Sequence, residues 1–348
     1  MPREEVYTGH ALVGEDLEER DVQIHVEEGR IVCIEEIHRV PDTWICPAFF
    51  NAHTHIGDTV AMDTSAQGSL ADLVTPPHGL KHRILSATPR TDLISAMRAS
   101  MRVMVDSGTH AFADFREGGE EGANALREAL ENAPIESLIF GRDGGERVSD
   151  GIGIPGTRDI SGVETIVSSA RREGKLVAIH AGERDPGDME AALALDPDLL
   201  IHCTHATEGD LRECADRGIP IALCPRSNWI LGVSGSARHP PIRRMQEIGC
   251  TLLLGTDNAM FVQPDMLSEM AFTATVYKVS PREVIQTAVL GSKLFLKPFF
   301  IQENAPANFF SINPSRSNLT WSANRYSTIV KRVNRCDITK NVINPVRK

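Results

Sequence analysis

Short apolar runs alternate with longer amphipathic segments through the middle of this 348-residue chain. Segments 91–106, 163–173 and 208–217 have the spacing of amphipathic helices. The apolar runs cover residues 44–50, 110–115, 136–140, 176–180, 199–202, 219–224 and 251–255, with a weaker run at 151–154. Strands that alternate with helices indicate parallel βαβ units, and this many of them predict a (β/α)8 barrel. A doubly wound open sheet is the competing architecture, but no G-x-G-x-x-G sequence follows the first run to support nucleotide binding there.

The two ends of the chain have a different pattern, with short β-like segments and turns. Residues 22–26 alternate apolar and polar positions, and residues 30–34 follow after a Glu-Gly turn, which predicts a hairpin. After about residue 304 the sequence again has the pattern of β-strands, at residues 308–312 and 327–333. We therefore expect residues 1–48 and 304–348 to form a small β-sandwich, with the barrel at 49–303.

Composition narrows the class of protein. The chain is 41% hydrophobic and 24% charged, as in ordinary globular proteins, and its net charge of −11 argues against nucleic-acid binding. Its 7 cysteines include no C-x-x-C pair, which favours reduced thiols in the cytoplasm. There is no apolar segment typical of a signal peptide at the start and no run of about 20 apolar residues. We expect a cytoplasmic protein without a membrane partner.

Polar residues that can bind a metal ion stand where the apolar runs end. His53 and His55 follow the first run, His180 and His202 close two later runs, and Asp257 comes just after the last. Residues two apart on a strand share a face, and barrel enzymes place their catalytic groups at the carboxyl ends of the strands. Neutral imidazole is a common ligand of zinc and iron. The pattern therefore predicts a metal site.

This ordered set resembles the amidohydrolase superfamily, in its branch of cytosine, guanine and S-adenosylhomocysteine deaminases and chlorohydrolases. Residues 45–55, I-C-P-A-F-F-N-A-H-T-H, resemble the first-strand signature of that family, with Ala48 where glycine is common. The resemblance covers nearly the whole chain, including the β-sandwich made from both ends. It implies a metal-dependent hydrolase that acts on a small molecule.

The resemblance also implies the number of metal ions. Two-metal members bridge their ions with a carboxylated lysine after the fourth strand, and residues 137–160 contain no lysine. This favours one divalent ion, zinc first and iron as the alternative, although a bridging glutamate would leave a second ion open. The implied ligands are His53, His55, His180 and Asp257.

Further motifs suggest catalytic roles. The sequence H-A-G-E at 180–183 is similar to the motif of adenosine deaminases, in which the glutamate moves a proton to a ring nitrogen of the substrate. By that resemblance Glu183 is catalytic, and His202 orients the attacking water or polarises the bond under attack. Asp257 would accept the proton of the water. We interpret His205 as a loop histidine without a catalytic role.

Substrate contacts are predicted from loops after the strands. Arg116 or Glu117 follows the second run, and Asn228 lies in a segment similar to chlorohydrolase- and guanine-deaminase-like members. His82 lies in the long loop after the first run, which often covers the site in lidded enzymes.

The leading hypothesis is an aminohydrolase that deaminates a small aminated heterocycle. Hydrolysis of a cyclic amide, as in imidazolonepropionase-like relatives, is the main alternative, and dechlorination also occurs in the family. A barrel scaffold without catalysis is a further alternative, which the complete set of ligands, acid and base argues against. A homodimer is the commonest assembly and is expected here.

Overall fold

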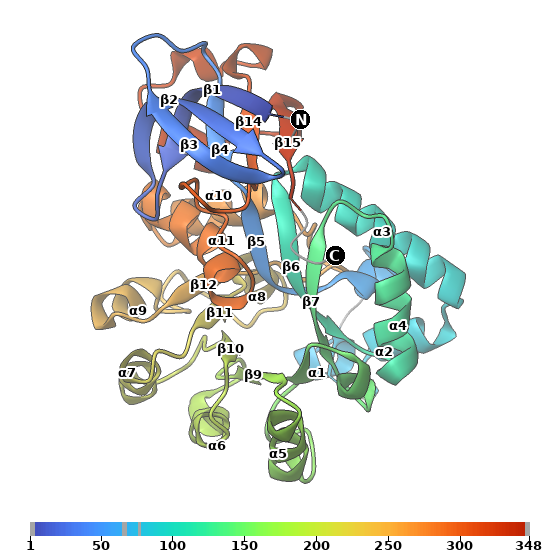
Figure 1. The fold of residues 1–348 in the computed structure, drawn as a ribbon. Coiled ribbons are helices and arrows are strands. Elements are labelled where there is room, and N and C mark those ends of the chain that lie inside the picture. Colours follow the sequence, from blue (N-terminus) through green and yellow to red (C-terminus); the bar gives the residue numbers. More distant parts are fainter. Residues whose placement is uncertain (1–3, 65–67, 76–77, 345–348) are drawn as a thin grey trace.

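The computed structural model describes residues 4–64, 68–75 and 78–344. Figure 1 shows a barrel with its surrounding helices and a separate small sheet that contains both the first and the last strands of the chain. This arrangement confirms the predicted architecture of a barrel with a small β unit built from the two chain ends.

Nine parallel strands make the barrel wall among the described residues. In chain order they are β5 (Phe49–His55), β6 (Thr109–Arg116), β7 (Glu136–Gly141), β8 (Gly151–Ile154), β9 (Leu176–Ala181), β10 (Leu199–His202), β11 (Ile221–Leu223), β12 (Leu252–Leu254) and β13 (Asp257–Asn258). The last two are pieces of one extended segment, because β12 pairs with β11 and β13 pairs with β5. The ring is thus closed at eight positions, as the (β/α)8 pattern predicts.

The wall strands are buried along their whole length or nearly so. Parallel strands covered on both faces read as continuous apolar runs, which is why the sequence marks them so clearly. Polar side chains near the carboxyl ends of several strands form the site described below.

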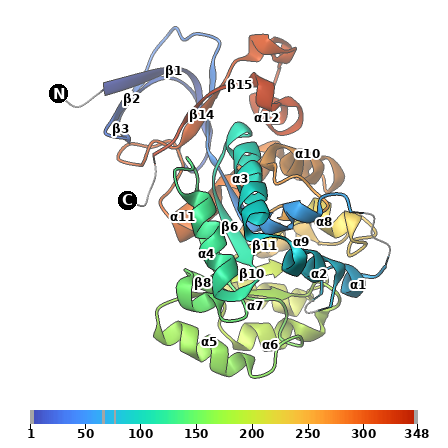
Figure 2. The same cartoon turned by 90° about the vertical axis from the view of Figure 1, so that its right-hand side faces the viewer.

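Helices cover the outside of the wall, as Figures 1 and 2 show. They are α3 (Arg90–Asp106), α4 (Gly119–Leu130), α5 (Val163–Arg172), α6 (Met189–Ala194), α7 (Glu208–Asp216), α9 (Ile242–Ile248), α10 (Met266–Val276) and α11 (Pro281–Phe295). Three of them confirm the predicted amphipathic segments. Helix α7 begins with a capping box, in which Thr207 and Asp210 each accept a backbone N–H of the other residue.

The remaining helices lie in the connections between strands or after β14. The α-helices are α1 (Leu70–Leu73), α2 (Leu80–Ala87), α8 (Pro225–Ile230) and α12 (Arg325–Arg332). The 3-10 helices are η1 (Ile56–Ala61), η2 (Gly145–Val148), η3 (Pro186–Asp188), η4 (Pro314–Arg316), η5 (Leu319–Trp321) and η6 (Arg335–Asp337). No helix among the described residues is both long enough and apolar enough to cross a bilayer.

The small sheet has six strands in the order β15-β14-β4-β1-β2-β3. They are β1 (Glu4–Val13), β2 (Glu18–Glu27), β3 (Arg30–Glu36), β4 (Trp44–Pro47), β14 (Phe309–Ile312) and β15 (Ile338–Val342). Strand β14 pairs antiparallel with β4, so segments from the two ends of the chain lie side by side.

Two expectations about individual segments are corrected. The apolar run at 44–50 is not one barrel strand, because β4 belongs to the small sheet and only β5 enters the barrel. Residues 327–333 are not a strand but fall largely within α12, and the last strand of the small sheet is instead β15, which pairs with β14. Asn324 caps α12 by accepting the backbone N–H of Ser327, and the helix buries Thr328, Ile329 and Val330 against the protein.

Buried side chains connect the small sheet to the barrel. The rings of Phe49 on β5 and Phe310 on β14 meet edge to face with their centroids 5.1 Å apart. His110 on β6 is 1% exposed, and its Nε2 lies 3.0 Å from Oδ1 of Asn341 on β15. The two C-terminal strands, β14 and β15, therefore pack against the first two barrel strands, β5 and β6.

Candidate active site

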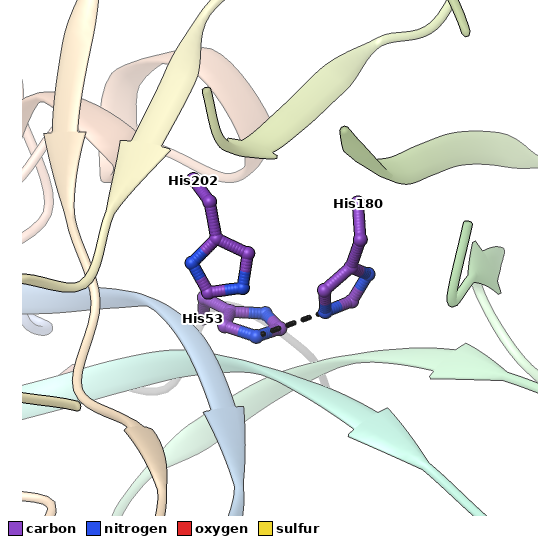
Figure 3. Close-up of side chains that lie close together, drawn as sticks. All are labelled: His53, His180 and His202. Carbon is purple, nitrogen blue, oxygen red and sulfur yellow. Dashed lines mark hydrogen bonds between the residues drawn. The ribbon is translucent and has the colours of Figure 1, made fainter. Parts of the chain in front are cut away.

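The metal-capable residues predicted from the sequence meet at the carboxyl end of the barrel. His53 and His55 come from β5, His180 from β9, His202 from the end of β10, and Asp257 from the start of β13. All five are buried. Figure 3 shows the rings of His53, His180 and His202 turned toward one another from three strands.

The distances between these side chains are those of a shared ligand sphere. His53 Nε2 lies 3.2 Å from His180 Nε2 and 3.2 Å from Asp257 Oδ1. His55 Nε2 lies 3.5 Å from the same Oδ1. Ligands at the usual zinc–nitrogen distance in a tetrahedron are about 3.3 Å apart, so the spacing fits a transition-metal ion.

Two groups of three potential ligands share His53. One contains His53, His180 and His202, and the other contains His53, His55 and Asp257, with the ligand atoms of each group within 4.8 Å of one another. The structure thus brings together all four predicted ligands and adds His202 as a neighbour of the same site.

Hydrogen bonds to residues outside the cluster fix the tautomer of His180 and the orientation of the Asp257 carboxylate. His180 Nδ1 lies 2.9 Å from the carbonyl oxygen of Ile154, so it donates its proton there and leaves Nε2 with a free lone pair. Ser227 Oγ donates to Asp257 Oδ2 at 2.6 Å, and Oδ1 is left facing the histidines. Nδ1 of His53 has no hydrogen-bond partner among the described residues.

Burial sets the protonation of the cluster. It lowers the pKa of His53 to about 4 and that of His55 to about 3, so both imidazoles are neutral near pH 7, as metal ligation requires. Burial by itself would raise the pKa of Asp257, but the hydrogen bond and charge of His53 outweigh it. The pKa of Asp257 therefore lies well below its ordinary value, and the carboxylate is ionised.

The backbone is unusual at two positions of the site. His202 has a φ of 71° and Asp257 a φ of 61°, both in the left-handed region that residues other than glycine seldom adopt. Such conformations persist only where the surroundings enforce them, and they gather at active sites. His202 is the last residue of β10 and Asp257 the first of β13, and both side chains face the cavity at the mouth of the barrel.

Glu183 lies beside this cluster. It follows β9, its side chain is 18% exposed, and its Oε1 is 3.6 Å from His202 Nε2. Burial raises the pKa of Glu183, and nearby His202 only partly offsets the effect. A carboxyl group with a raised pKa next to a metal-capable cluster is suited to moving protons.

A cavity of about 50 Å³ opens over these residues. The metal-capable residues His55, His180, His202 and Asp257 line it together with Glu183 and three cations, Lys81, Arg142 and Arg184. The rest of the lining is Leu70, Val74, Thr75, Pro155, Asp159, Leu231 and Asn258. Glu183 and His202 therefore face the same cavity as His55, His180 and Asp257, three of the predicted ligands.

The predicted substrate contacts lie elsewhere. Asn228 is fully buried and donates to Thr204 Oγ1, and His82 Nε2 lies 3.1 Å from the carbonyl oxygen of Val74. Arg116 is 1% exposed and pairs with two buried acids. None of the three is among the residues that line the cavity. His205 contacts the carbonyl oxygen of a loop residue, at a distance of 3.2 Å.

None of the three cations of the cavity wall was predicted from the sequence. Arg142 directly follows β7, the same position relative to a strand that the metal-capable residues hold, so this signal was present in the sequence. Lys81 lies on α2 and is 3% exposed. Nothing in the local pattern of the sequence distinguishes it from a surface lysine.

The fold and the cluster define a barrel hydrolase with a metal-capable centre, and comparison with known proteins agrees. The profile of the amidohydrolase family matches residues 44–297. A putative aminohydrolase of Methanothermobacter thermautotrophicus is 36% identical over 97% of this chain and 96% of its own length. The chain belongs to the amidohydrolase family.

Other similar proteins are deaminases or hydrolases by name. The 5-methylthioadenosine/S-adenosylhomocysteine deaminase of Pelotomaculum thermopropionicum is 30% identical over 67% of this chain and 61% of its own length. The structure of an adenosine deaminase from Xanthomonas campestris with bound zinc superimposes with a TM-score of 0.75 at 16% identity, covering 97% of this chain and 91% of that one. A triazine hydrolase variant reaches a TM-score of 0.83 at 14% identity, over 98% and 93% of the two chains. These structures share the fold.

Proposed function

We propose that this protein is a metal-dependent aminohydrolase that removes the amino group from a nucleobase- or nucleoside-like heterocycle. The observation that carries the proposal is Glu183, a carboxyl group of raised pKa that shares a cavity with His202 and the ligand cluster. The names of the similar aminohydrolases and deaminases support the same reaction. Zinc is the proposed ion, because the similar adenosine deaminase structure holds zinc.

The proposed ligands are His53, His55, His180 and Asp257. A divalent ion held by them would lower the pKa of a water molecule and supply positive charge for the transition state. Asp257 is ionised, and its Oδ1 faces the cluster because Ser227 holds Oδ2. This oxygen is therefore placed to accept a proton from the water.

The remaining steps use Glu183 and His202. The water oxygen bonds to the carbon that bears the amino group, while protonated Glu183 gives its proton to the adjacent ring nitrogen. Asp257 passes the first proton of the water to the amino group, which leaves as ammonia. The second proton returns to Glu183 as the carbonyl forms, so amine and water give lactam and ammonia. His202 orients the water and stabilises the tetrahedral species.

The test is ammonia release from a panel of aminated purines, pyrimidines, nucleosides and triazines, with zinc content measured on the same protein. We expect one zinc per chain and ammonia from one ring class. Glu183→Gln should lower the rate at least about a hundredfold with zinc content unchanged. Glu190→Gln, the same change at an exposed residue of α6, is the matched control.

Three outcomes contradict parts of the proposal. One metal per chain without ammonia from any amine would exclude deamination of these rings and direct the assay to cyclic amides. Two tightly bound ions would contradict the four-ligand, one-metal assignment. Full activity of Glu183→Gln would remove the proton-transfer role.

The setting of the enzyme is part of the proposal. All 7 cysteines are free thiols, which supports a reducing compartment such as the cytoplasm. A homodimer stays a prediction, which size-exclusion chromatography with light scattering tests directly.

A further inference from the structure

A network of buried charges lies directly beside the ligand cluster. It joins η1, α2 and the segments that end β6 and β7, and each of its members is less than a tenth exposed. Three cations face three acids through ion pairs of 2.7–3.4 Å. The members are Asp58, Lys81, Asp114, Arg116, Glu117 and Arg142. Buried charges are costly, so such a network calls for a reason beyond stability.

Glu117 is the member that meets the ligand cluster. Its Oε1 lies 2.7 Å from Lys81 Nζ, 3.4 Å from Arg142 Nη1 and 2.8 Å from His55 Nδ1. Its Oε2 accepts a hydrogen bond from Arg116 Nη2 at 2.7 Å. The carboxylate is therefore fixed at both oxygens by three cations, with the ring nitrogen of His55 against one of them.

His55 needs an acceptor of this kind. A metal-bound histidine uses one ring nitrogen for the ion, and an acceptor for the other N–H fixes the tautomer and the ring orientation. His180 has the carbonyl oxygen of Ile154 for this purpose. His55 Nδ1 is buried, and its distance to Glu117 Oε1, 2.8 Å, is that of a hydrogen bond. The oxygen lies off the direction of the N–H bond, so the hydrogen-bond angle is not met in this structure. Glu117 Oε1 is the acceptor within its reach.

We propose that Glu117 is a positioning residue of the metal site, which accepts the Nδ1 proton of His55 and so keeps Nε2 free for the ion. Lys81, Arg116 and Arg142 hold its carboxylate in place. Lys81 lies on α2, in the segment between β5 and β6. Through the ion pair of Lys81 with Glu117, this segment helps to fix the orientation of His55, a proposed metal ligand. This inference rests on the metal site of the proposed function and not on the deamination reaction.

The test is the zinc affinity of Glu117→Gln, measured on metal-free protein by competition with a chromophoric chelator. We expect affinity to fall about 10- to 100-fold, the usual effect of losing such a partner. The visible absorption spectrum of the cobalt-loaded protein should change as well, because it reports the ligand geometry directly. A purely structural role of Glu117 would leave that spectrum unmoved.

Asp58→Asn is the matched control. Asp58 is also fully buried and also pairs with Lys81, at 2.8 Å, but no ion pair or hydrogen bond joins it to a predicted ligand among the described residues. We expect zinc affinity and cobalt spectrum to stay as in the wild type. If Glu117→Gln fails to fold, Glu117→Asp serves instead, since it keeps the charge and withdraws the oxygen from His55.

The outcomes separate this inference from the proposed function. Wild-type protein that binds neither zinc nor cobalt would overturn the metal site and this inference with it. Wild-type binding with unchanged affinity and spectrum in Glu117→Gln or Glu117→Asp would overturn the inference alone. An equal loss in Asp58→Asn would also overturn it, because the effect would then follow from the charge of the network.

Discussion

Ser227 holds the one carboxylate among the predicted ligands, and its removal gives a measurable loss. Its hydroxyl donates to Asp257 Oδ2 at 2.6 Å, and neither residue has more than 6% of its surface exposed. In Ser227→Ala the carboxylate oxygen Oδ2 of Asp257 would stay buried and charged without its hydrogen-bond donor. The hydroxyl also keeps the carboxylate from turning, so that Oδ1 faces His53.

The size of the loss follows from the type of bond. A hydrogen bond to a charged group contributes about 1.5–3 kcal/mol, and each 1.4 kcal/mol is about a factor of ten in an equilibrium constant. We therefore expect zinc affinity to fall roughly 10- to 100-fold. The assays are chelator competition for zinc and urea unfolding of the metal-free protein.

The control is a buried serine away from the cluster. Ser149 Oγ donates to the carbonyl oxygen of Gly145 at 2.7 Å, a bond between neutral groups. Ser149→Ala should lower the free energy of unfolding by about 1 kcal/mol and leave zinc affinity unchanged. If Ser227→Ala matches the wild type in zinc affinity and in unfolding, the hydroxyl does not hold the carboxylate and the reasoning is wrong.

Three further predictions concern packing, stability and pH. Gly255→Ala would bring a Cβ within 2.7 Å of the His53 backbone nitrogen, so we expect a loss of about 1–3 kcal/mol in urea unfolding and a lower zinc content; normal values of both would contradict this. Burial lowers the pKa of His110 in the folded protein to about 4. Below about pH 6.5 the unfolded chain therefore binds a proton at His110 that the folded protein does not, and by about pH 4.5 this lowers the free energy of unfolding by about 2.5 kcal/mol. In urea unfolding of metal-free protein His110→Asn should lack that loss, and an equal loss in both proteins would refute the assignment. Because Glu183 must start protonated and burial raises its pKa, kcat/KM should fall as pH rises through that pKa, and a rate that rises instead would exclude an acid role.

The barrel and the cluster of metal-capable residues were predictable because the local pattern marks both the strands and the polar residues near their ends. Strands buried on both faces give uninterrupted apolar runs, and a polar residue at the end of such a run stands out. His180 and His202 stood out in this way near the ends of β9 and β10, and Asp257 stood out just after β12, where it begins β13. A barrel brings the carboxyl ends of all its strands to one face. Residues at these ends can therefore be expected to lie close together even when they are far apart in the sequence.

What the sequence did not predict has physical causes. Residues 327–333 contain β-branched side chains that favour strands, but the Asn324 cap and the burial of Ile329 and Val330 decide for a helix. The substrate contacts stay predictions: they were assigned from loop position alone, which does not tell whether a side chain faces a cavity. Arg116 turns instead to buried acids, and the role of Lys81 depends on partners far away in the sequence. Such long-range pairs leave no trace in local periodicity.

The order of strands in the small sheet has a consequence for synthesis of the chain. Strand β4 lies between β1 and β14, and β14 begins only at Phe309. Chains grow at about 5–20 residues per second, so one edge of β4 waits on the order of tens of seconds for its partner. During that time a row of backbone N–H and C=O groups is open to pairing with other chains. Expression of a chain cut before β14 should therefore yield aggregates, although every predicted metal ligand would be present.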